Sequence, residues 1–232
     1  EALLYLTEHL HVDPLASIES VGDFEDFSIR ASMVAFLAKP GRAQNAEAAR
    51  LMLSKMAEET GPGGQRTRLE AARLISFLPD LFDRELRVLL QDDDPDVAKA
   101  AILAAGRLKK RIFVGRIIER MDDPALVPTA VEALAGFGDR IVGTLRDFLV
   151  DPEMPIDVRR EIPTVLQAIG TRAAQNVLTE SVLDNDVVLR YHSIAALNKL
   201  GQLHPERPVD RKIIESVLAA EMSSKREITS IS

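Results

Sequence analysis

The sequence predicts an all-α fold in which antiparallel helix pairs stack into an α-solenoid. The first observation is a degenerate repeat, because the segment from Asp94 to Leu108 recurs along the chain. The second is its period. The last aligned positions lie 39, 29, 29, 32 and 31 residues apart, at Gly41, Asp80, Lys109, Gly138, Gly170 and Gly201. The third is that no run of alternating β-branched residues predicts a strand. Repeats of this length are typical of solenoids, in which each unit buries its apolar face against its neighbours.

The expected elements follow in chain order. Residues 1–26 form an irregular or helical lead-in, and a first helix over 27–38 ends at Lys39-Pro40-Gly41. A long amphipathic helix is expected over 43–59, and then a flexible loop at Gly61-Pro62-Gly63-Gly64. Short helices then alternate over 66–78, 81–91, 96–109, 112–121, 124–136, 141–150, 158–169, 173–183, 187–200 and 211–221. The repeat array therefore covers 27–222, and 223–232 is a flexible tail.

Turn residues agree with this division. In Asp94-Pro95 and Asp123-Pro124, an acidic N-cap precedes a proline at the first helical position, where the missing N–H costs nothing. Gly138, Gly170 and Gly201 are expected to end their helices, because glycine readily adopts the left-handed conformation.

Composition narrows the possible functions. The chain has 232 residues, a formal charge of −7, no Cys, no Trp and 4% aromatic residues. Disulfides and thiolate metal sites are excluded, and few side chains could stack on bases or flat cofactors. Because acidic residues outnumber basic ones, we expect no nucleic acid partner. No apolar stretch approaches the roughly 20 residues that span a bilayer, so we expect no direct membrane insertion. The apolar pattern at Glu1 suggests a piece of a longer polypeptide.

Three helix starts resemble HEAT-like repeats of the short bacterial type: Asp94 to Val97, Asp157 to Arg160 and Val188 to Arg190. The resemblance covers 27–201, with 208–221 as a half unit, and implies a right-handed solenoid that serves as a protein-interaction scaffold. The segments Ile29 to Ala31, Ala72 to Ile75 and Ala195 to Leu200 also resemble the cytoplasmic repeat domain of bacterial nucleotide-translocase-type transporter fusions.

Basic residues at the starts of second helices are the candidate site. The resemblance implies that Arg30, Arg159 and Arg190 bond to an Asp of the adjacent unit, as a ladder that fixes the stacking. The alternative is a groove for an anion or an acidic partner, because second helices line the concave face of the family. In that case Arg73, Lys99, Arg160 and His192 would join them.

Other candidate chemistry is weaker. Asp92, Asp93, Asp94 and Asp96 lack the spacing, Gly and distal Glu of a calcium loop. His9, His11 and Asp13 do not share one helix face, and His192 has no paired nucleophile in the sequence. Neither Gly61 to Gly64 nor Gly136 to Gly138 has the context of a phosphate or dinucleotide loop. We therefore expect no catalytic residue, cofactor or metal ion.

Function is expected to follow from binding rather than catalysis. The hypothesis is a non-catalytic scaffold that binds a protein partner or a neighbouring domain of the same polypeptide. Its location would be cytoplasmic, with a possible tether to the inner membrane through a missing transmembrane domain. The alternative is a helical-repeat enzyme of the lyase or DNA-glycosylase type.

Overall fold

A computed structural model describes residues 43–76 and 82–206, and within those ranges every regular element is helical. Unit 1 contains α4 (Ala43–Ala57), α5 (Gly64–Ile75), α6 (Asp83–Leu89), α7 (Pro95–Leu108) and η1 (Arg111–Phe113). Unit 2 contains α8 (Val114–Glu119), η2 (Arg120–Asp122), α9 (Val127–Ala135), η3 (Gly138–Ile141), α10 (Val142–Val150), α11 (Ile156–Ile169), α12 (Arg172–Ser181) and α13 (Val187–Leu203). The all-α fold is confirmed for these residues. The predicted lead-in, first helix, last half unit and tail lie outside them.

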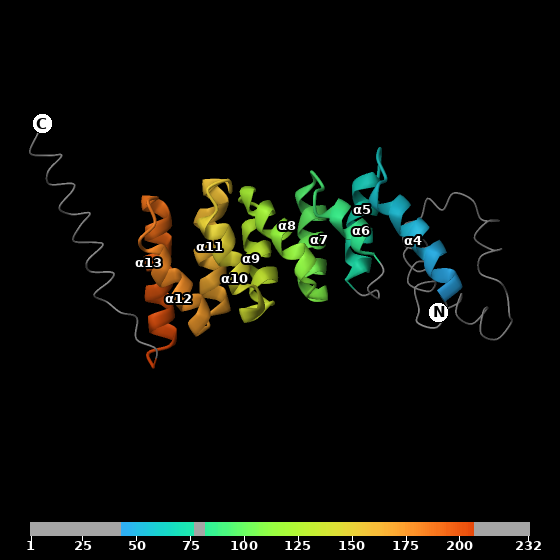
Figure 1. Cartoon of the computed structure of the whole chain (residues 1–232). Helices are drawn as coiled ribbons and strands as arrows, with labels where there is room; N and C mark the ends of the chain where they lie inside the picture. Colours follow the sequence, from blue (N-terminus) through green and yellow to red (C-terminus); the bar gives the residue numbers. More distant parts are fainter. Residues whose placement is uncertain (1–42, 77–81, 207–232) are drawn as a thin grey trace, which may run out of the picture. The chain divides into compact units, whose positions relative to one another are not determined.

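Each unit has two layers of helices (Figure 1). In unit 1, the first helices of the pairs, α4 and α6, contact each other, and so do the second helices, α5 and α7. In unit 2, α10 contacts α12 in the first layer, whereas α11 lies between α9 and α13 in the second. We call α5, α7, α9, α11 and α13 the second helices below. This arrangement of stacked pairs is that of an α-solenoid.

The core repeats from one second helix to the next. Val158, Ile162, Val165 and Leu166 of α11 are buried, and so are Leu189, Ser193, Ala196 and Leu197 of α13. Each residue of the second set lies 31 positions after its counterpart in the first. Successive helices therefore present the same face to the interior. Buried apolar area of this kind is the main source of stability, at about 25 cal/mol for each Å².

The helix starts differ from the prediction at one proline. Asp94 caps α7 as predicted, because its Oδ1 accepts the main-chain N–H groups of Asp96 and Val97 and Pro95 is the first helical residue. The same prediction for Asp123-Pro124 is wrong. Asp123 Oδ1 accepts the N–H of Ala125, and this bond closes a turn. Helix α9 begins only at Val127.

The helix ends also differ at two of the three glycines. Gly170 ends α11 with a left-handed φ of 68°, as predicted. Gly138 has a φ of 61° but opens η3 instead of capping α9, which ends at Ala135 with Gly136 as its C-cap. Gly201 lies inside α13, where the hydrogen bond from His204 N to Leu200 O continues the helical pattern. Glycine permits the left-handed conformation without enforcing it.

One carboxylate lies inside unit 1. The Glu85 side chain on α6 is 2% exposed, and neither of its oxygens accepts a hydrogen bond. Arg50 Nε on α4 lies 3.8 Å from Glu85 Oε1, but the Arg50 side chain is 45% exposed. A buried charge with so little compensation costs free energy. Glu85 therefore lowers the stability of the packing between α4 and α6.

Candidate functional site

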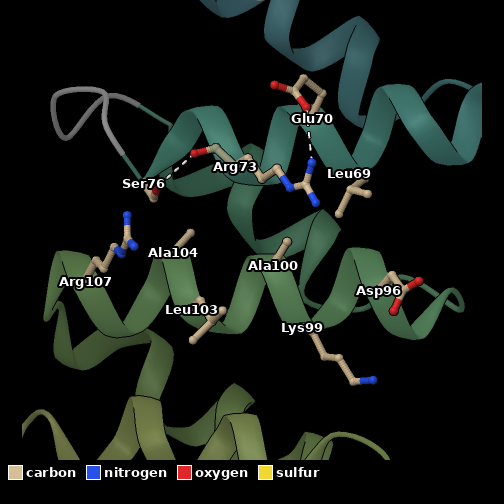
Figure 2. Close-up of a pocket in the computed structure, with 10 residues that line it drawn as sticks. All are labelled: Leu69, Glu70, Arg73, Ser76, Asp96, Lys99, Ala100, Leu103, Ala104 and Arg107. Atoms are coloured by element: carbon tan, nitrogen blue, oxygen red, sulfur yellow. Dashed lines mark hydrogen bonds and ion pairs between the residues drawn. The ribbon is translucent and has the colours of Figure 1, made fainter.

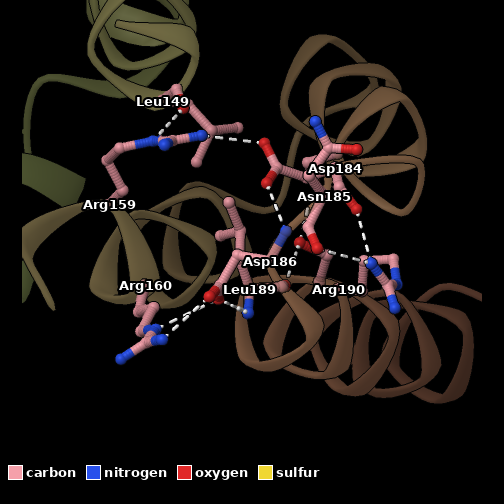
Figure 3. Close-up of polar contacts among 10 residues, drawn as sticks. Leu149, Arg159, Arg160, Asp184, Asn185, Asp186, Leu189 and Arg190 are labelled. Carbon is pink, nitrogen blue, oxygen red and sulfur yellow. Dashed lines mark hydrogen bonds and ion pairs between the residues drawn. The ribbon is translucent and has the colours of Figure 1, made fainter. Parts of the chain in front are cut away.

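Arg159 joins two successive helix pairs in unit 2 (Figure 3). It is the fourth residue of α11, and its Nε donates to the carbonyl oxygen of Leu149 at the end of α10, at 2.7 Å. Its Nη2 donates to Oδ2 of Asp184, before α13, at 2.8 Å. The two side chains are only 15% and 20% exposed. One guanidinium thus binds a helix end of its own pair and an Asp of the next pair, which is the contact that the ladder interpretation predicts.

Arg68 repeats this arrangement in unit 1. Its Nη1 donates to the carbonyl oxygen of Glu59 at 2.8 Å, and its Nε and Nη2 donate to Asp92 at 2.6 and 3.2 Å. The hydrogen bond to Asp92 raises the pKa of the guanidinium. Arg68 was not predicted from the sequence. Aligning Asp80 with Lys109 places Ala72 level with Ala101, whereas the buried positions match Ala71 with Ala101 and Thr67 with Val97. A one-residue shift places Arg68 level with Arg159.

The carboxylates of the ladder share a second feature. Asp92 Oδ1 accepts the N–H of Asp94 at 3.0 Å, and Asp184 Oδ1 accepts the N–H of Asp186 at 2.9 Å. Asp94 and Asp186 in turn cap the next helix. The signal in the sequence is an Asp-x-Asp turn that begins 24 residues after Arg68 or 25 residues after Arg159. Each turn therefore combines a helix cap with an acceptor for the preceding arginine.

Arg160 forms a parallel contact to Asp186. Its Nε and Nη2 donate to the two carboxylate oxygens at 3.0 and 2.8 Å, and Nη1 donates to Asp157 at 3.1 Å. The bond to Arg160, together with the N–H of Leu189, lowers the pKa of Asp186 to about 2 against the opposing effect of burial. Bidentate geometry of this kind gives strong charge-assisted hydrogen bonds. Most donors of Arg160 are therefore engaged within unit 2.

Replacing Asp186 by Asn is expected to remove part of the acid dependence of stability. The folded-state pKa of about 2 lies below the ordinary value of 3.8, so this carboxylate stabilises the fold above pH 4 and loses that effect as the pH falls toward 2. Asn can still cap α13. Urea unfolding should show a loss of about 1–2 kcal/mol at pH 5 that narrows toward pH 3.

The same change at Asp157, whose side chain is 80% exposed, is the control for Asp186→Asn. It should leave stability nearly unchanged at both pH values, because exposed pairs contribute little. A constant loss for Asp186→Asn from pH 5 to pH 3 would contradict the assignment of the pH dependence to this carboxylate.

Arg190 and His192 lie on α13. Arg190 Nη1 donates to the carbonyl oxygens of Asp184 and Asn185, at 2.7 and 3.0 Å. His192 Nδ1 lies 2.7 Å from the carbonyl oxygen of Arg160 on α11, so Nδ1 carries a hydrogen and donates it. Arg190 thus stabilises the turn before its own helix, and His192 ties α13 to α11.

Arg73 and Lys99 lie apart from these contacts. Both line a groove between α5 and α7 in unit 1 (Figure 2), and the Arg73 side chain is 61% exposed, with Nη1 3.7 Å from Glu70 Oε2. The predicted residues therefore lie in two separate places. Arg159, Arg160, Arg190 and His192 come together where α11 meets α13, whereas Arg73 and Lys99 line the groove. Arg30 lies outside the described residues, so its predicted role stays a prediction.

Two aspartates of the acidic run before α7 already accept hydrogen bonds, from main-chain N–H groups and from an arginine. Asp92 accepts from Arg68, and Asp94 caps the helix. Across residues 43–76 and 82–206, no group of three His, Asp or Glu side chains is placed to hold a metal ion. His9, His11 and Asp13 lie outside those ranges. None of the described helices combines the length and apolar character needed to cross a membrane.

Comparison with known proteins supports the repeat architecture. Residues 113–198 match the model of the HEAT repeats family. The matched segment covers α8 to α12 and most of α13. A search of curated proteins gave no match. The crystal structure of an engineered protein is similar at 17% identity over 82% of this chain and 96% of that one, with a TM-score of 0.38. Human deoxyhypusine hydroxylase in complex with glycerol is similar at 16% identity over 82% and 100%, with a TM-score of 0.28. At these TM-scores, the two similarities say nothing about the function of this chain.

Proposed function

We propose that this chain is a non-catalytic helical repeat scaffold that binds a protein partner, or a neighbouring domain of its own polypeptide, along the second helices. The observation that carries the proposal is on α13, which leaves four large apolar side chains exposed. Val187, Val188 and Tyr191 lie together in its first two turns and Leu203 lies at its other end, with exposed fractions from 41% to 69%. An exposed apolar patch such as that of Val187, Val188 and Tyr191 is a mark of interaction sites.

The hydrogen bonds of Arg160 and His192 favour a binding role over a catalytic role for α11 and α13. His192 gives its Nδ1 hydrogen to a main-chain carbonyl, and Arg160 is bonded to two aspartates. These contacts hold side chains in fixed positions on the surface where α11 and α13 meet. A general base would instead need hydrogen-bond reach to a nucleophile or substrate. The alternative from the sequence, a lyase or DNA glycosylase, has no comparable supporting observation.

The scaffold proposal can be tested by site-specific photo-crosslinking in the cells that naturally make the protein. A benzophenone amino acid replaces Tyr191 on α13, which is 69% exposed, or Val150 at the end of α10, which is 66% exposed. The proposal predicts a discrete protein adduct from position 191 and none from position 150. Equal adducts from both positions, or none from position 191, would contradict it.

We further propose that the scaffold is a cytoplasmic domain of a larger transporter polypeptide. The support is the resemblance of Ala72 to Ile75 and Ala195 to Leu200 to the repeat domain of such fusions. An antibody against this chain should detect a band much larger than 25.5 kDa in carbonate-washed membranes. A soluble band near 25.5 kDa would overturn the transporter proposal and leave the scaffold proposal standing.

A further inference from the structure

Four turns of the chain share one hydrogen bond. Each contains an aspartate whose Oδ1 accepts the main-chain N–H of the residue two positions later, at 2.9 or 3.0 Å. Each turn follows the first helix of a pair and precedes the second helix. The aspartates are Asp92, Asp123, Asp151 and Asp184. The four turns therefore offer the same carboxylate acceptor.

Two of these aspartates receive an arginine and two do not, in the part of the chain that the structure describes. Arg68 donates to Asp92 and Arg159 donates to Asp184, in each case from the helix pair before the turn. Within residues 43–76 and 82–206, no basic side chain donates to Asp123 or Asp151. The ladder therefore lacks an arginine for Asp151, which lies inside unit 2.

Val127 stands where that arginine is expected. Four buried residues of α9 and the turn before it have a buried counterpart on α11, 32 positions later: Leu126, Ala130, Ala133 and Leu134 match Val158, Ile162, Val165 and Leu166. The same offset takes Arg159 back to Val127, the first residue of α9. Valine has no hydrogen-bond donor in its side chain. The joint between the pairs α8/α9 and α10/α11 therefore lacks the contact that joins α10/α11 to α12/α13.

Backbone structure around α8 and α9 is also less regular. All three 3₁₀ helices of the described residues flank these two α-helices: η1 precedes α8, η2 follows it, and η3 follows α9. Segments of 3₁₀ helix have poorer hydrogen-bond geometry than an α-helix. Helix α9 also has only 9 residues, against 14 in α11. Fewer main-chain hydrogen bonds and less buried area lower the free energy needed to open this pair.

We infer that the joint between the pairs α8/α9 and α10/α11 is the flexible joint of unit 2. At this joint α9 opens away from α11, whereas Arg159 keeps α10/α11 fixed to α12/α13. The ladder thus divides unit 2 into one mobile pair and a rigid block of two pairs. Opening changes the surface that the second helices of unit 2 present. The inference concerns motion within the chain and holds whether or not a partner binds there.

Hydrogen exchange of the whole chain, read by mass spectrometry under native conditions, tests the inference. Exchange in α9 should be at least roughly tenfold faster than in α11, relative to the rates of the unfolded chain, because opening the joint leaves the rigid block intact. The variant Val127→Arg should supply the missing donor to Asp151 and slow exchange in α9 at least roughly fivefold. Adding Asp151→Asn should remove most of this slowing, since a neutral amide binds a guanidinium more weakly.

Two further variants are the controls. Val127→Met lengthens the side chain without adding a donor, so exchange in α9 should not slow as it does in Val127→Arg. Arg159→Met breaks the existing contact to Asp184, so it should speed exchange in α12 and α13 more than in α8 and α9. Circular dichroism must show that each variant keeps its helical content.

Spin labels carry the test if Val127→Arg does not fold. Glu132, Thr164 and Ala195 are exposed at matching positions of α9, α11 and α13, and the chain has no Cys. Electron paramagnetic resonance of nitroxides on Glu132→Cys with Thr164→Cys should show a broader distribution of distances than Thr164→Cys with Ala195→Cys. Equal widths, equal exchange in α9 and α11, or unchanged exchange of α9 in folded Val127→Arg would each overturn the inference.

Discussion

Replacing Arg159 by Met is expected to lower the free energy of unfolding by about 2–4 kcal/mol. Met keeps much of the apolar stem but removes the hydrogen bonds to Leu149 and Asp184. The carbonyl oxygen of Leu149 and the carboxylate of Asp184, which is 20% exposed, then lose a donor. Breaking one side of a buried charged contact costs more than the contact itself contributes, because the remaining charge is left without compensation.

Urea unfolding followed by circular dichroism measures this loss, and Arg146 provides the control. Arg146 Nε donates to Glu180 at 2.8 Å, but the two side chains are 56% and 57% exposed. Arg146→Met should therefore cost no more than about 0.5 kcal/mol. Equal losses for the two variants would show that the burial of Arg159 adds nothing to the free energy of unfolding.

Replacing Glu85 by Met is expected to raise the free energy of unfolding by about 1–3 kcal/mol. The carboxylate is 2% exposed, neither oxygen accepts a hydrogen bond, and Arg50 Nε lies no closer than 3.8 Å. A flexible apolar side chain of similar length should fill the same space between α4 and α6 without the cost of a buried charge. The gain should appear as a higher urea midpoint with an unchanged slope.

Arg50 separates the electrostatic explanation of this gain from simple packing. Arg50→Met should destabilise the original chain, because Glu85 loses its nearest positive charge. It should have almost no effect in the Glu85→Met background, since that charge has no partner left. A similar effect of Arg50→Met in both backgrounds would mean that the Arg50–Glu85 contact is not the source of the cost.

The architecture could be predicted from the sequence because repeat burial is local. Each second helix presents small or apolar residues at matching positions, such as Ala101, Ile162 and Ser193, so one aligned pattern identifies several helices. The described α-helices lie where helices were expected, with ends that moved by a few residues, but η3 was not predicted and α5 begins at Gly64, inside the predicted loop. Helix ends depend on caps and turns, and competing signals at Pro124 and Gly201 misplaced two of them.

The candidate site was predictable only in part. Arg159 could be found because the repeat around it is regular, whereas Arg68 lies in a divergent repeat that begins with Gly64 and has no Asp or Val at its start. Its role depends on Asp92, and that pairing appears only once the turn has folded. The groove could not be predicted as a unit, because Arg73 and Arg107 come from different helices and nothing in their local sequence pairs them.

The most direct test of the ladder is the coupling energy between Arg159 and Asp184, from a double-mutant cycle of Arg159→Met and Asp184→Asn. The ladder interpretation holds that this contact fixes the stacking of successive helix pairs and that Arg159 is not free to bind a partner. It predicts a coupling of about 1.5–3 kcal/mol, against at most about 0.5 kcal/mol for the same cycle at Arg146 and Glu180. A coupling near zero for Arg159 and Asp184 would contradict it and return Arg159 to the candidates for partner binding.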